Sequence, residues 1–158
     1  MQLAQTGHLC VFTLHANTAS QAFERILNFY PEEAHKQVLT DLSLNLTGII
    51  CQRLAIKKNK DGRTAVVDLL INTPAVQDLI LKGDIIGLRY LMESAQTDGM
   101  QTMDQNLFKL YNQNIIDYEE ALRQSVSAND LRLRIQLYEE GRHPDRLYDR
   151  INDLNLVS

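Results

Sequence analysis

The apolar residues in the first half of the chain follow the patterns of strands in three places. Residues 8–14, HLCVFTL, form a nearly continuous apolar run, which predicts a strand covered on both faces, as in a parallel sheet. Two later runs, IICQRLAIK and TAVVDLLIN, are rich in strand-forming residues and flank a turn that contains Asp61 and Gly62. A turn of this composition is typical of a hairpin, so we expect these two strands to pair antiparallel.

Between the first strand and the hairpin, apolar residues recur every three or four positions and predict two helices. The first covers residues 18–30, where Thr18 and Gln21 have the spacing of a capping box. The second follows Pro31 and covers residues 32–47, with a stop expected at Gly48. The residues expected on the buried faces are Ala22, Ile26 and Phe29 in the first helix and Ala34, Val38, Leu42 and Leu46 in the second.

Beyond residue 72 the sequence predicts helices. Thr73 and Pro74 mark a helix start, and this helix is expected to end at Gly83. Further starts are predicted at Asp84, Thr102, Asp117, Ser127 and Pro144. Residues 131–137, LRLRIQL, alternate like a strand, but they also share a helical face and follow a cap, which favours a helix.

These patterns divide the chain into two expected parts. Residues 1–72 are predicted to be mixed α/β, and residues 73–158 are predicted to be all-helical. The formal net charge is −4, so no overall positive field recruits nucleic acid or an anionic membrane. No apolar run approaches the roughly 18 residues of a membrane-spanning helix. Cys10 and Cys51 lie in apolar runs and are expected to be buried free thiols, as is usual in the cytosol.

His15 is the candidate ligand-binding residue. It follows the predicted strand 8–14 and would lie at the carboxyl end of a parallel sheet, the edge where open α/β sheets bind ligands. The helix expected after Thr18 would offer free N–H groups to an anion such as phosphate. A hydrogen-bonded structural histidine is the competing interpretation. A metal site of His8, Cys10 and His15 is disfavoured, because alternation and the length of the strand keep the three apart.

Several segments of the sequence resemble one family. TGHLCVFTLHANTA resembles the "His box" of the secretion ATPase superfamily, the hexameric motors of type II secretion and type IV pili. ICQRL is similar to the family segment I-S-Q-x-L, and GMQTMDQNLFKLY is similar to G-M-Q-T-L-D-Q-x-L. LLINTPAVQDLILKG resembles the segment around the AIRNLIR motif, with Val76, Gln77 and Asp78 in place of its Ile, Arg and Asn. SANDLRLRIQL resembles the C-terminal signature of the PilU-like retraction ATPases.

The resemblance implies a fold and roles for two residues. The fold is the C-terminal part of a RecA-like P-loop ATPase domain, with a parallel strand and an antiparallel hairpin, followed by a helical C-terminal region. By family analogy, His15 senses the γ-phosphate of ATP, and His8 acts within the same box. The resemblance also implies a motor for pilus retraction and twitching motility.

The nucleotide site implied by the resemblance is incomplete in this sequence. No G-x-x-x-x-G-K-[ST] phosphate loop and no acidic Walker B strand end occur in it. The chain is therefore expected to correspond to the C-terminal half of the motor domain. ATP and Mg²⁺ are implied as cofactors of the full-length parent, whereas this chain is predicted to bind neither and to be inactive alone.

The resemblance also implies partners and a location. It implies a hexameric homo-oligomer, PilT-type motor subunits and the inner-membrane platform protein as partners, and a cytoplasmic position peripheral to the inner membrane. An alternative of a different class remains open. In this alternative the chain is a non-catalytic interaction module that docks on a pilus or secretion complex.

Overall fold

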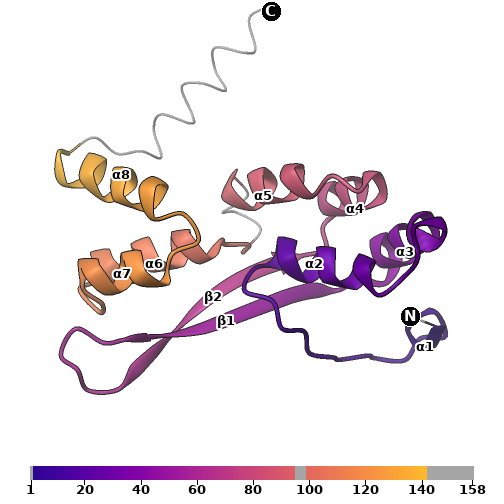
Figure 1. Ribbon diagram of the computed structural model, residues 1–158, viewed down its shortest axis with the longest axis horizontal. Helices are drawn as coiled ribbons and strands as arrows, with labels where there is room; N and C mark the ends of the chain where they lie inside the picture. Colours follow the sequence, from indigo (N-terminus) through magenta and orange to yellow (C-terminus); the bar gives the residue numbers. More distant parts are fainter. Residues whose placement is uncertain (1, 95–98, 142–158) are drawn as a thin grey trace, which may run out of the picture.

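The computed structural model describes residues 2–94 and 99–141, which form an α/β chain with one two-stranded antiparallel sheet (Figure 1). The helices are α1 (Gln2–Gln5), α2 (Ala19–Asn28), α3 (Glu32–Asn45), α4 (Pro74–Lys82), α5 (Ile85–Ser94), α6 (Met103–Asn112), α7 (Tyr118–Gln124) and α8 (Ala128–Glu139). The strands are β1 (Gly48–Ile56) and β2 (Arg63–Ile71). The helix predicted from Pro144 lies outside the described residues. Within the described ranges, no helix combines the length and the apolar character that a bilayer crossing requires.

The hairpin confirms the predicted antiparallel pairing. Its register runs from Gly48 opposite Ile71 to Ile56 opposite Arg63, so every residue of β1 has a partner in β2. Gly62, in the turn, has a φ of 83°, which glycine adopts without a steric penalty. Because side chains alternate along a strand, one face of the hairpin turns toward the helices and the other turns away from them.

Five helices begin at side-chain caps that the sequence predicts. In each case the cap oxygen accepts a hydrogen bond from the backbone N–H three residues later, which satisfies one of the free donors of the first turn. The caps are Thr18, Thr73, Thr102, Asp117 and Ser127. The ambiguous residues 131–137 are helical and belong to α8, as predicted. The helix α4 ends at Gly83, whose left-handed conformation confirms the predicted stop.

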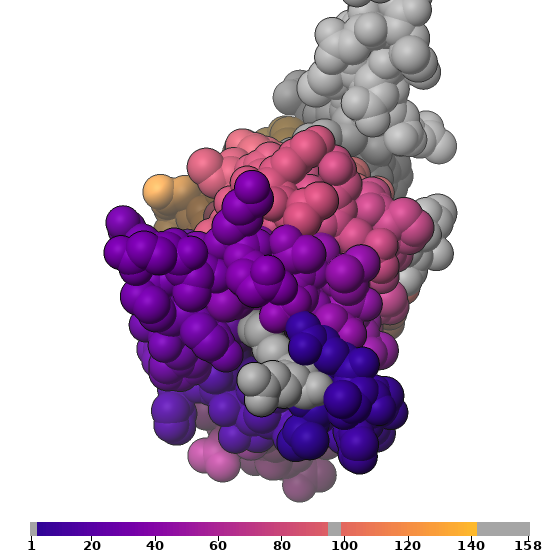
Figure 2. All heavy atoms as spheres, turned by 90° about the vertical axis from the view of Figure 1, so that its right-hand side faces the viewer, coloured from indigo at the N-terminus to yellow at the C-terminus, as the bar shows by residue number. Residues whose placement is uncertain are grey.

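Helices α2 to α8 stand along one side of the hairpin in two groups, and each group forms its own core (Figure 1). The first core joins α2, α3, α4 and α5 to Leu70 near the open end of the hairpin. The second joins α6, α7 and α8 to Ala55 and Val66 near its turn. Figure 2 looks at the first group from its end, where the purple of α3 adjoins the pink of α4, with the indigo N-terminal residues below. The inward face of β2 therefore passes from one core to the other.

Residues 8–14 do not form a strand, so the predicted parallel strand is wrong. They run extended between α1 and α2, and among the described residues they pair with no strand. Leu9, Val11 and Phe12 are 88%, 85% and 62% exposed. A strand requires a neighbour whose backbone groups take its N–H and C=O groups, and the β1–β2 hairpin does not offer one here.

Two expectations about the first helices are also wrong. Phe29 is exposed, because it follows the last residue of α2 and the buried face of that helix runs through Phe23 instead. Gly48 is the first residue of β1 and does not stop the preceding helix. That helix ends at Asn45, where Leu46 takes up extended backbone dihedrals.

The two cysteines lie in opposite environments. Cys51 is buried on the inward face of β1, as predicted, and burial together with the nearby Asp68 raises the pKa of its thiol to about 11. Cys10 is exposed with the rest of the extended segment, which corrects the expectation that both are buried.

Candidate functional site

The two histidines of the predicted site lie at the two ends of the extended segment. His15 is exposed and stands four residues before the first residue of α2. His8 is also exposed, and its Nδ1 atom lies 3.0 Å from the Thr6 hydroxyl oxygen. The structure therefore places His15 beside a helix start and His8 away from it. Their roles remain predictions.

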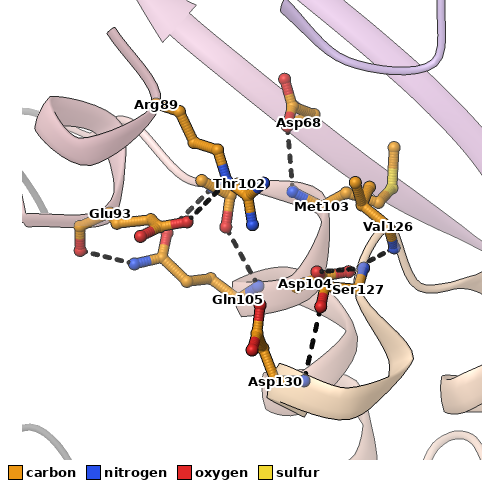
Figure 3. Close-up of polar contacts among 10 residues, drawn as sticks. All are labelled: Asp68, Arg89, Glu93, Thr102, Met103, Asp104, Gln105, Val126, Ser127 and Asp130. Atoms are coloured by element: carbon orange, nitrogen blue, oxygen red, sulfur yellow. Dashed lines mark hydrogen bonds and ion pairs between the residues drawn. The ribbon is translucent and has the colours of Figure 1, made fainter. Parts of the chain in front are cut away.

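The side chain that organises this region is Asp68, on the inward face of β2. Asp68 is only 3% exposed, and each of its carboxylate oxygens accepts a backbone hydrogen bond. Oδ1 accepts the N–H of Ala19 at 2.8 Å, and Oδ2 accepts the N–H of Met103 at 3.0 Å (Figure 3 shows the second bond). Ala19 and Met103 are the first residues of α2 and α6. One carboxylate thus binds the N-terminal ends of two helices.

The electrostatics of Asp68 follow from this position. Burial raises the pKa of the carboxyl group above its ordinary value, and the neighbouring Asp104 acts in the same direction. The two backbone hydrogen bonds and Arg53 act against the rise, because they favour the charged form. A carboxylate in the middle of an apolar strand face is costly unless it is hydrogen-bonded, and the free N–H groups and positive ends of two helices meet that need.

Figure 3 shows that the polar contacts continue from α6 to α5 and α8. Asp104 accepts the N–H groups of Val126 and Ser127 at 2.7 and 3.0 Å, which fixes the start of α8. Gln105 completes the capping box and also donates its Nε2 to the Glu93 carbonyl at 2.7 Å. These bonds hold the starts of α6 and α8 and the end of α5 in one network.

A cavity of about 190 Å³ lies beside Asp68, between the starts of α2 and α6 and the side of α5. Its lining residues are Thr18, Ser20, Gln21, Asp68, Arg89, Met92, Glu93, Thr102, Met103, Asp104 and Val126. The charged groups in this lining are three carboxylates and one guanidinium, and Arg89 is paired with Glu93 at 3.0 Å. Such a lining repels a phosphate group more than it attracts one.

The start of α2 does not fit a nucleotide phosphate in the way the sequence suggests. The N–H of Ala19 is bonded to Asp68, and the N–H of Gln21 is bonded to the Thr18 hydroxyl. Two of the N–H groups predicted to be free at this helix start are therefore occupied, and the acceptor at Ala19 is an anion that the protein itself supplies. The residues present do not form a phosphate cradle by themselves.

Sequence reasoning did not single out Asp68. The available signal was its place in TAVVDLLIN, where a single charged residue interrupts an apolar strand. A charge at such a position requires a buried partner. The partners, however, lie 49 and 35 residues away along the chain, so the sequence alone did not name them.

Comparison with known proteins identifies the family. Residues 1–123 match the model of the family described as "Type II/IV secretion system protein". The chain belongs to this family. It is 53% identical over 138 residues to the type IV pilus ATPase PilU of Pseudomonas aeruginosa, and this match covers 87% of the chain and 36% of that protein. It is 35% identical over 118 residues to the retraction ATPase PilT of the same organism, covering 75% of the chain and 34% of PilT.

Solved structures support the same family. A crystal structure of the pilus retraction motor PilT with bound ADP superposes with a TM-score of 0.66 at 37% identity, covering 74% of this chain and 32% of that one. The ATPase DotB of Legionella pneumophila shares the fold, with a TM-score of 0.56 at 19% identity over 68% of this chain and 29% of its own. This chain spans about a third of the length of the relatives that it matches. The predicted resemblance to PilT and PilU is confirmed.

Proposed function

We propose that this chain is part of an ATP-driven motor for type IV pilus retraction, with His15 on its nucleotide-facing side. The observation that carries the proposal is the 53% identity to the ATPase PilU over 138 residues. The exposure of His15 supports it further, because an exposed imidazole beside a helix start is open to a ligand held by another part of the motor.

The rest of the nucleotide site comes, in this proposal, from residues outside this sequence. No phosphate loop occurs in the chain, and the start of α2 already binds Asp68. ATP and Mg²⁺ are therefore cofactors of the complete motor. In the same proposal residues 1–72 are the second half of a RecA-like ATPase domain, and residues 73–158 are the helical region that faces neighbouring subunits of a hexamer. The motor works on the cytoplasmic side of the inner membrane, beside the platform protein and PilT-type subunits.

A segment exchange tests this proposal. The matching segment of P. aeruginosa PilU is replaced by this chain, and ATP hydrolysis by the purified chimera is measured. We expect the chimera to hydrolyse ATP and His15→Ala to lower kcat at least about tenfold, the scale typical of a lost proton-transferring or orienting group. His35→Ala is the matched control, since His35 is a half-buried histidine on α3 whose Nε2 donates a hydrogen bond to the Tyr30 carbonyl.

The result that would contradict the proposal is a chimera whose rate is unchanged by His15→Ala. Titration of the purified 158-residue chain with ATP and Mg²⁺ adds a second check. We expect no binding in the micromolar range, and micromolar binding would show that the nucleotide site is complete without any other segment.

The alternative function, a non-catalytic module that docks on a pilus or secretion complex, is favoured by one observation. The extended segment exposes Leu9, Val11 and Phe12, and apolar groups exposed together mark interaction surfaces. This alternative predicts a chimera without ATP hydrolysis and a chain that still binds the pilus machine. The same exchange experiment therefore separates the two functions.

A further inference from the structure

Asp68 occupies the boundary between the two cores of the molecule. On β2, Val66 belongs to the core of α6, α7 and α8, and Leu70 belongs to the core of α2 to α5. Asp68 lies between them on the same face. Its two partners divide in the same way, because Ala19 is a residue of the first core and Met103 is a residue of the second. The carboxylate thus joins the two helix groups across the hairpin.

We propose that Asp68 is a positioning residue, whose single carboxylate fixes the start of α2, and with it the segment that carries His15, to the start of α6. The hydrogen bonds from Ala19 and Met103 to Asp68 require no nucleotide. Its meaning for catalysis rests on the proposed function, since the position of His15 matters to ATP hydrolysis only if His15 meets the nucleotide.

The geometry distinguishes this role from ordinary core packing. The first N–H groups of a helix have no partner within the helix, so Ala19 and Met103 depend on Asp68 for their hydrogen bonds. His15 is four residues from Ala19, and among the described residues no side chain hydrogen-bonds to its ring. The position of His15 therefore depends on the backbone of residues 16–18, which connects it to Ala19 and to the hydrogen bond between Ala19 and Asp68.

The decisive variants are Asp68→Ala and Asp68→Asn in the 158-residue chain without nucleotide. Asp68→Ala removes both acceptors, so we expect amide hydrogen exchange at Ala19 and at Met103 to accelerate at least about tenfold. Asp68→Asn keeps one acceptor oxygen and replaces the other with a donor, so we expect only one of these amides to lose protection. Backbone order parameters of residues 15–18 are expected to fall in Asp68→Ala.

Asp104→Asn is the matched control. It also changes a carboxylate in the first turn of α6, but its partners are the N–H groups of Val126 and Ser127. Asn again keeps one acceptor oxygen, so we expect exchange to accelerate at one of those two amides and to stay at its original rate at Ala19. Urea unfolding of each variant shows whether its folded population suffices for the comparison.

A measurement on the unchanged chain avoids the risk that a variant fails to fold. The amide chemical shifts of Ala19 and Met103 are followed by NMR as the pH falls, and both are expected to change with one common midpoint. The other groups facing Asp68 are Arg53 and Cys51 of β1, Asp104 of α6, and Arg89 and Glu93 of α5. Asp104→Asn and Glu93→Gln identify any midpoint that belongs to those carboxyl groups instead.

Three results would overturn the proposal. The first is unchanged exchange at Ala19 and Met103 in Asp68→Ala, and the second is a pair of separate midpoints in the titration. The third is unchanged order at residues 15–18 after the bond at Ala19 is lost. None of these measurements involves ATP, so they fail or succeed independently of the segment exchange described above.

Discussion

At the scale of single residues, this chain uses buried carboxylates to join elements that are distant in sequence. Glu120 on α7 is a second example beside Asp68. It is 7% exposed, and its Oε1 accepts the N–H of Ile56, at the end of β1, at 2.8 Å. Arg123 and Gln124, on the same helix, also donate to its carboxylate. Burial raises the pKa of Glu120, but these donors together outweigh that effect, and the pKa lies below its ordinary value.

The lowered pKa of Glu120 predicts how the stabilisation by its hydrogen bonds to β1 and α7 depends on pH. A carboxyl group with a lowered pKa in the folded chain stabilises it above the unfolded pKa of about 4.5, and this contribution is lost as the pH falls through the folded pKa. Glu120→Gln is expected to lower the free energy of unfolding by about 1–2 kcal/mol at neutral pH. The difference from the original chain should narrow below about pH 4.5, as measured by urea unfolding at a series of pH values.

Glu119→Gln provides the control for that series, because Glu119 is the exposed neighbour of Glu120. Its effect should be small at every pH. If the difference in the free energy of unfolding between Glu120→Gln and the original chain stayed constant below about pH 4.5, the lowered pKa of Glu120 would be contradicted.

At the scale of elements, the helix starts of this fold differ in how completely their donors are satisfied. The start of α6 has the fullest set, since the Thr102 hydroxyl accepts the N–H of Gln105, the Gln105 side chain accepts the N–H of Thr102, and Asp68 accepts the N–H of Met103. At the start of α8 the cap bond from the Asp130 N–H to the Ser127 hydroxyl is exposed to solvent. A buried start with several partners loses more when its cap is removed.

The two caps can be compared directly. Thr102→Ala is expected to lower the free energy of unfolding by about 1–2 kcal/mol, and Ser127→Ala by about 0.5 kcal/mol. Thr102 is buried, whereas the cap bond at Ser127 is exposed. Chemical unfolding of both variants measures the difference, and equal losses would show that burial of the cap does not matter here.

At the scale of the whole molecule, the covered and uncovered sides of the hairpin decide which surface meets other molecules. The helices cover one face of the sheet, and Ile50, Leu54 and Ile56 are exposed on the other face. The extended segment adds Val11 and Phe12 to the exposed apolar residues. Apolar groups exposed in such number favour association between chains, particularly next to an unpaired backbone segment.

We therefore expect the purified chain to self-associate through residues 8–14 or the outer face of the hairpin. Sedimentation over a range of concentrations is the measurement. The double variant Val11→Ser with Phe12→Ser should shift the equilibrium toward monomer, because it removes apolar area from this surface. Leu133→Ser is the control, because it changes an exposed apolar residue on α8, away from this surface, and should leave the equilibrium unchanged. A chain that stays monomeric at the highest concentration would contradict the prediction.

The distance along the chain between interacting residues explains which features the sequence could predict. The caps at Thr18, Thr102 and Asp117 were found because a cap and its donor lie three residues apart. The strand predicted at residues 8–14 was not found, because a strand exists only with a partner that its own sequence does not contain. His15 was named from its place after the predicted strand, and its role was named through a family resemblance. Asp68 was missed because its two donors come from segments far along the chain.

The contrast between the two cysteines has a practical consequence. Thiol reagents attack the thiolate, and the buried Cys51, with its pKa of about 11, stays protonated and shielded at neutral pH. The exposed Cys10 lies five residues before His15. A maleimide dye added at neutral pH should attach to Cys10 alone, without any engineered substitution. Cys10 thus provides one site for a fluorescent label, close to His15, so the label would report on the surroundings of that histidine.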